Sequence, residues 1–195
     1  MIKSKLRQCF KIITAIAIFG MLLSASDGRS QDKQKTETIQ ATAMGTSTSM
    51  GRMFNVNILI ESYSTPQDQK TLIDAFQSGG HDRLVETLSK MKGKGRVAMT
   101  GTVGYQIAYV RSVPTPNGRK IRIITDRPIN VGEAHFNGRS TDYDLSAIEI
   151  NIAKDQDKSD GVLIVAGRFR VDKNKQIELE SLGNPWRLAN VMERD

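Results

Sequence analysis

Apolar and polar residues alternate with a period of two along much of this chain, and this pattern predicts β-strands. The first alternating segment runs from Phe54 to Ile60, and β-branched residues dominate from residue 96 onward. The predicted strands cover 54–61, 103–113, 119–125, 148–152, 162–171 and 176–182. A proline and Asn-Gly turn at 114–118 joins two of them, and most other connections are also short enough for hairpins. The sheet is therefore expected to be mainly antiparallel.

Residues 66–91 follow a helical pattern instead. Ser64 and Thr65 offer capping hydroxyls for a helix that starts at Pro66, and Asp68 lies in the first turn, where the helix dipole favours an anion. Gly79 and Gly80 end this helix, and a second one follows to about residue 91. The sequence thus predicts a helical hairpin.

Together these elements indicate an α+β fold: a mainly antiparallel, curved sheet of six or seven strands with an N-terminal helical hairpin over one side. A long open meander would expose two strand edges, so a partly closed barrel is the alternative.

The N-terminus has the layout of a secretory signal peptide. Four basic residues without an acidic one precede an apolar run at 12–23, which is shorter than the ~20 residues that span a bilayer. Small residues follow, and we expect cleavage after Ala25 or Ser26; an uncleaved anchor is the alternative. The prediction is an exported protein, periplasmic or extracellular, with no stable transmembrane segment after processing.

The rest of the chain divides into two predicted parts. Residues 27–52 are rich in Gln, Ser, Thr and Gly and nearly lack large apolar side chains, which predicts a flexible spacer between the signal peptide (1–26) and the folded part. Residues 53–195 have the size of a single β-rich globular domain.

Cysteine content and charge exclude several classes of function. The single cysteine, Cys9, lies in the signal peptide, so the mature domain has no disulfide, thiolate metal site or cysteine nucleophile. The net charge of +7 includes four basic signal residues; without them 24 Lys and Arg stand against 21 Asp and Glu, a net of +3. We therefore expect no nucleic-acid partner.

The best candidate for chemistry is a polar cluster around His135. Glu133 lies on the same face of an extended segment, and Asp142 and Asp144 follow within the reach of one loop. An imidazole with carboxylates is suited to general acid/base catalysis or a loose metal site. No zinc-binding pattern is present, however, and no metal or cofactor is predicted. A solvated polar loop explains the same residues.

The other histidine, His81, stands beside Asp82 at a predicted helix start, where both are explained as turn and capping residues.

Tyr105 and Tyr109 lie four residues apart in one predicted strand, hence on one face. Such a pair is usually part of a core, but it is also a candidate for lining an apolar ligand cavity if the sheet curls.

The stretches PTPNGRKIRIITDRPI (114–129) and NPWRL (184–188) resemble segments of a group of uncharacterised exported bacterial proteins of similar length. The resemblance covers most of the mature domain and implies no activity, ligand or catalytic residue.

The first functional hypothesis is a non-catalytic binding or structural domain of the bacterial cell envelope. Its partner would be an envelope protein, a surface polymer or an apolar small molecule bound through the sheet face. The alternatives are a hydrolytic or metal-assisted enzyme centred on His135, and an accessory subunit that pairs through an exposed strand edge.

Overall fold

The computed structural model describes residues 36–100, 102–130, 143–171 and 177–194, which form a barrel of antiparallel strands with one long helical element. The strands are β1 (Glu37–Met44), β2 (Met53–Ile60), β3 (Gly95–Met99), β4 (Tyr105–Thr115), β5 (Gly118–Thr125), β6 (Leu145–Ala153), β7 (Asp160–Val171), β8 (Ile177–Ser181) and β9 (Trp186–Arg194). The helical element is α1 (Pro66–Lys90), and short 3₁₀ helices occur at η1 (Ser47–Ser49) and η2 (Gln156–Lys158).

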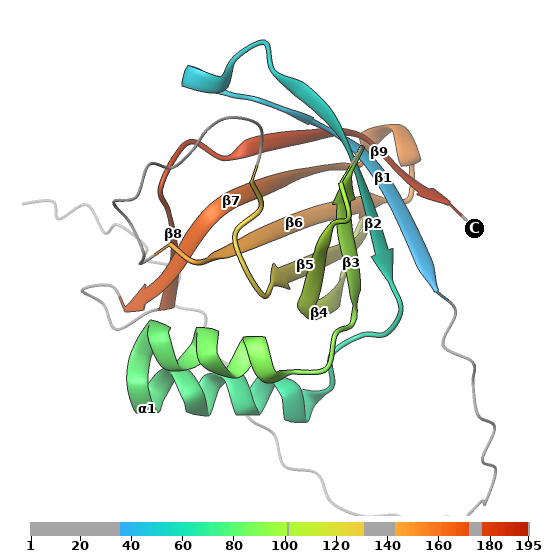
Figure 1. Cartoon of the computed structure of the whole chain (residues 1–195). Helices are drawn as coiled ribbons and strands as arrows, with labels where there is room; N and C mark the ends of the chain where they lie inside the picture. The colour runs from blue at the N-terminus through green and yellow to red at the C-terminus, as the bar shows by residue number, and fades with distance from the viewer. Residues whose placement is uncertain (1–35, 101, 131–142, 172–176, 195) are drawn as a thin grey trace, which may run out of the picture. The chain divides into compact units, whose positions relative to one another are not determined.

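The sheet closes on itself. Strands β6, β5, β4, β3, β2, β1, β9 and β7 are neighbours in that order, and pairing of β6 with β7 completes a ring of eight (Figure 1). The ninth strand, β8, pairs with the second half of β7, whereas β9 pairs with residues 161–163 in its first half. Closure removes the exposed edges that an open meander would have, and it makes the expected curved antiparallel sheet a closed barrel.

Alternate residues of the strands fill the barrel interior. Isoleucines from opposite walls, including Ile39, Ile58, Ile121 and Ile150, are 0% exposed and belong to one apolar cluster. An eight-stranded barrel is just wide enough for side chains to fill it. In the described part of the chain, the interior is therefore a packed core.

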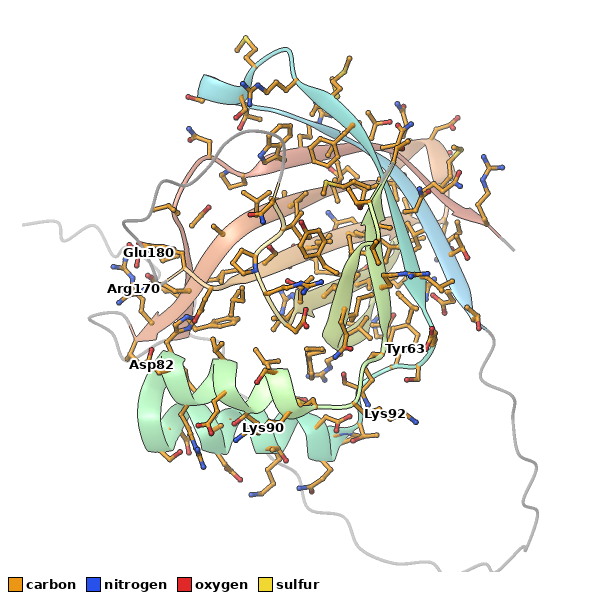
Figure 2. The ribbon with its side chains drawn as sticks, viewed as in Figure 1. Tyr63, Asp82, Lys90, Lys92, Arg170 and Glu180 are labelled. Atoms are coloured by element: carbon orange, nitrogen blue, oxygen red, sulfur yellow. The ribbon has the colours of Figure 1, made fainter. Side chains whose placement is uncertain are left out.

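The inward positions at one end of the barrel are charged instead. Glu37, Arg119 and Glu193 continue the inward-facing alternation of β1, β5 and β9, and they meet there with Tyr63. Tyr63 follows β2 and is labelled near this end of the barrel in Figure 2. The barrel core is thus closed at this end by an ionic network.

The helical element packs on a second apolar cluster. Leu72 and Phe76 from the first half of α1 and Leu84 and Leu88 from the second half are buried with residues of β4 and β6, and partly buried residues of β4, β5, β7 and β8 pack against them. In Figure 1, α1 runs along the lower end of the barrel. In the described residues, no helix is both long and apolar enough to cross a membrane.

The start and the break of α1 lie where the sequence predicts them. The Thr65 hydroxyl accepts a hydrogen bond from the Asp68 N–H, and the Asp68 carboxylate accepts one from the Thr65 N–H, which forms a capping box. The backbone is non-helical at Gly79 and Gly80, and Gly80 has a φ of +66°. The predicted hairpin is not seen as two separately assigned helices: α1 is one element in which the non-helical Gly79 and Gly80 divide two helical segments at the predicted break.

The predicted spacer is wrong over residues 37–44, which form β1 between β2 and β9. Ile39, Ala41 and Ala43 are inward-facing and at most 4% exposed. Two of these three residues are alanines, so the alternation carries little hydrophobic signal even though the strand is central. The predicted strand set also lacks β3 and β9.

Candidate ligand-binding site

Three residues of the predicted acid/base cluster, Glu133, His135 and Asp142, lie outside the described residues. The fourth, Asp144, is described and directly precedes β6. Its carboxylate contacts the other histidine of the chain, His81, with Oδ1 2.6 Å from Nε2. Among the described residues, no three His, Cys, Asp or Glu side chains are grouped so that they could hold a metal ion.

His81 connects the kink of α1 to the barrel. The Phe169 N–H donates to its Nδ1 at 3.1 Å, so Nδ1 carries no proton and Nε2 donates to Asp144. The ring is largely buried, with 10% of the side chain exposed. Since both ring nitrogens are engaged, this geometry is typical of a structural tie. The sequence analysis missed the pair because 63 residues separate the two partners.

The two candidate tyrosines do not share a face. A bulge between Ile107 and Tyr109 shifts the register of β4 against β5. Tyr105 consequently packs on the barrel core, and its hydroxyl accepts a hydrogen bond from the Asn130 N–H at 2.9 Å. Tyr109 packs on the cluster beneath α1 instead. The expectation that Tyr105 and Tyr109 lie on one face was wrong, because a bulge inserts one residue and breaks the period of two.

Tyr109 lines a hollow of about 660 Å³ on the outer face of the barrel, which we call the outer groove. Side chains of β4, β5, β6, β7 and β8 and of the first turn of α1 form its walls. A smaller hollow of about 170 Å³ adjoins it under α1 and is lined there by Leu72, Ile73 and Phe76. The larger volume lies in the range of ~300–1,000 Å³ that is usual for small-molecule sites.

The floor of the outer groove near α1 is apolar. Successive cross-strand partners there are Tyr109, Ile124, Ala147 and Ile164, which we call the apolar row. Phe169 and Leu179 add to the same surface. The row is part of the outer face because the residues next to it in the strands, such as Ile123 and Ile148, point into the barrel core.

Two residues further along each strand the floor becomes charged. The cross-strand partners in this charged row are Arg111, Arg122, Glu149 and Val162. Arg111 and Arg122 are directly opposite each other, an arrangement that like charges disfavour. The Arg111 Nη1 donates to the neutral amide oxygen of Gln69 at 2.8 Å.

Glu149 is the carboxylate of the charged row, and two cations hold it. Lys120 Nζ lies 2.6 Å and Arg122 Nε 2.8 Å from its oxygens. Burial alone would raise the pKa of the Glu149 carboxyl, but the hydrogen bonds from Lys120 and Arg122 outweigh it and bring the pKa below its ordinary value. Glu149 therefore stays ionised and is already neutralised by its neighbours.

Of the residues in the outer groove, the sequence analysis named Tyr109 alone. A usable signal was present: Ile123 and Ile124 are consecutive, and 162–166 is an unbroken apolar run. Strands that are covered on both faces have such consecutive apolar residues, whereas a strand with one face in solvent alternates apolar and polar residues.

Comparison with protein-family models, with curated proteins and with solved structures gives no match. The functional inferences below accordingly depend on the sequence and on the geometry of the described residues.

Proposed function

We propose that this protein is an exported, non-catalytic binding domain of the cell envelope that takes an apolar small molecule in the outer groove. The observation that carries the proposal is the apolar row, which lies at the floor of a hollow of about 660 Å³ and is only partly buried where α1 packs against it. Monomeric proteins seldom leave a contiguous apolar surface open unless it binds something.

Binding is favoured over catalysis by the state of the polar groups near the groove. Both ring nitrogens of His81 have hydrogen-bond partners, and Glu149 is paired with two cations. Neither group is poised to move a proton. The alternative of an enzyme centred on His135 concerns residues outside the described part of the chain and remains a prediction.

Barrel closure weakens the alternative of pairing through a strand edge. Each of the eight ring strands has two neighbours, whereas β8 pairs with β7 alone among the described strands, so closure leaves less exposed strand edge than an open sheet would. Export remains a proposal that is supported by the signal-like N-terminus. It would place the groove where apolar envelope molecules are encountered.

The proposal is tested by titrating the purified domain with the uncharged dye N-phenyl-1-naphthylamine, whose fluorescence rises in apolar surroundings. We expect saturable binding to the wild type. Ala147→Trp fills the centre of the apolar row and should weaken binding at least tenfold. The matched control Ala153→Trp lies on the same strand and face, about 20 Å away, and should leave binding within twofold.

A dye that does not bind, or one that binds the two tryptophan variants equally, would contradict the proposal. If circular dichroism shows that Ala147→Trp does not fold, a second pair replaces it. Val162→Glu introduces a charge at the groove, and Val171→Glu introduces the same charge on β7 outside the groove. The first should weaken dye binding and the second should not.

A further inference from the structure

We propose that the natural ligand of the outer groove is an amphipathic anion, with its apolar chain under α1 and its anionic head on Arg111 and Arg122. This inference rests on the proposed function, because it assigns the class of molecule that the groove takes. It comes from the order of the two rows: the apolar row is next to α1, and the charged row is two residues further along the strands.

The chain would occupy the end of the groove that α1 covers. Leu72 and Phe76 form the helical wall of the smaller hollow, and Ile73 beside them is 39% exposed. Phe169 and Ile124 line both hollows, so the smaller one continues the larger one toward α1. An exposed isoleucine at the mouth of an apolar hollow is explained if an alkyl chain covers it in the complex.

The head would bind where the groove has an excess of positive charge. Two cations, Arg111 and Arg122, and one carboxylate, Glu149, line the groove, and Lys120 also pairs with that carboxylate, which leaves an excess of positive charge there. In the described part of the chain, Arg111 has no carboxylate within ion-pair distance, and the Gln69 amide to which it donates is neutral. An anion between Arg111 and Arg122 would relieve the repulsion of this pair.

Guanidinium groups suit this role. Arginine presents several donors in a planar fork that matches carboxylate, sulfate and phosphate oxygens. The Arg122 side chain is 61% exposed, so it is accessible to a ligand head from the solvent side. Neighbouring rows on one face of a strand are about 7 Å apart, a short step along an alkyl chain. One molecule can thus reach both rows.

The test uses displacement of N-phenyl-1-naphthylamine by two probes of equal chain length, decanoate and 1-decanol, at a pH where decanoate is ionised. We expect decanoate to displace the dye at about tenfold lower concentration than 1-decanol, since the carboxylate accepts charge-assisted hydrogen bonds from the guanidinium groups and the neutral hydroxyl does not. Arg111→Gln should abolish this difference and leave displacement by 1-decanol unchanged.

The control Arg52→Gln makes the same change in net charge in the connection between β1 and β2, which does not line the groove, and should preserve the preference for decanoate. Equal displacement by decanoate and 1-decanol in the wild type would overturn the amphipathic anion and leave the proposed function standing. Failure of the dye itself to bind would remove both. A preference that Arg52→Gln abolishes as fully as Arg111→Gln would also overturn the assignment.

Binding to lipid vesicles distinguishes the two possible sources of the anionic head, a membrane lipid and a free amphiphile. Flotation with phosphatidylglycerol vesicles, compared with phosphatidylcholine vesicles, reports a lipid headgroup. If the wild type floats with the anionic vesicles alone and Arg111→Gln does not, the head belongs to a membrane lipid. If decanoate binds and neither vesicle recruits the protein, the ligand is a free amphiphile. Both results support the inference.

Discussion

Arg119 on β5 and Glu37 on β1 meet across one end of the barrel, with Nη2 and Oε2 3.0 Å apart, although β1 and β5 are on opposite sides of the ring. Arg119 also donates to Glu193 and, through Nη1, to the Tyr63 hydroxyl at 3.1 Å. Arg119 and Glu37 are each 26% exposed. One guanidinium therefore links three walls of the barrel end where the apolar core stops.

The first prediction concerns this network. Arg119→Met keeps much of the apolar stem but leaves two carboxylates and a phenol without their cation, which should lower the free energy of unfolding by about 2 kcal/mol. Urea denaturation measures it. Lys70→Met is the control, since it breaks an exposed pair with Asp74 and should change stability by less than about 0.5 kcal/mol. Equal losses in the two variants would show that the network contributes nothing particular.

The second prediction concerns alkaline pH. Burial raises the pKa of Tyr63 from 10.0 to about 12, and the hydrogen bond to Glu37 adds to the shift. Between these pH values the unfolded chain loses the phenolic proton and the folded protein keeps it. The stability that Tyr63 contributes is consequently complete below pH 10 and is lost as the pH rises toward 12.

Tyr63→Phe removes the titrating group, so its urea midpoint should fall less steeply than that of the wild type as the pH rises from 10 toward 12. In a pH titration of the folded proteins followed by tyrosinate absorbance, the variant should also lack the component that titrates near pH 12. Identical slopes for the two proteins in this window would refute the assignment.

The third prediction concerns the histidine that ties α1 to the barrel. His81→Ala leaves the Phe169 N–H without its acceptor and Asp144 without its donor, which should cost about 1–3 kcal/mol. Amide exchange at Phe169 should accelerate in this variant. Asp82→Ala, at the next position of the same helix, should leave Phe169 protected as in the wild type. Unaltered exchange in His81→Ala would mean that the tie is absent in solution.

Local signals in the sequence were sufficient for much of the fold. The Asn-Gly turn lies between β4 and β5, the alternation at 54–60 falls within β2, and the break in α1 is at Gly79 and Gly80. Each of these features depends on the conformational preferences or the period of adjacent residues. Central strand β1 was missed because small alanines provide two of its inward positions.

The candidate site was less predictable from the sequence, because the register between paired strands brings its residues together. Tyr109, Ile124, Ala147 and Ile164 become a row through three strand pairings, and a bulge decides that Tyr109 points outward. His81 contacts Asp144, which is 63 residues away in the sequence. Spacing along the chain indicates neither relationship: strand pairing aligns the row, and packing of α1 against the barrel brings His81 to Asp144.

Ligand binding in the outer groove is tested by methyl NMR of isoleucine-labelled protein during a titration with decanoate. Intermolecular contacts and the largest shifts are predicted at Ile73, Ile124 and Ile164 of the groove, with core methyls such as Ile58 and Ile121 unaffected. Contacts from the decanoate chain to Ile58 or Ile121, with the groove methyls unchanged, would place the ligand inside the barrel and contradict the account.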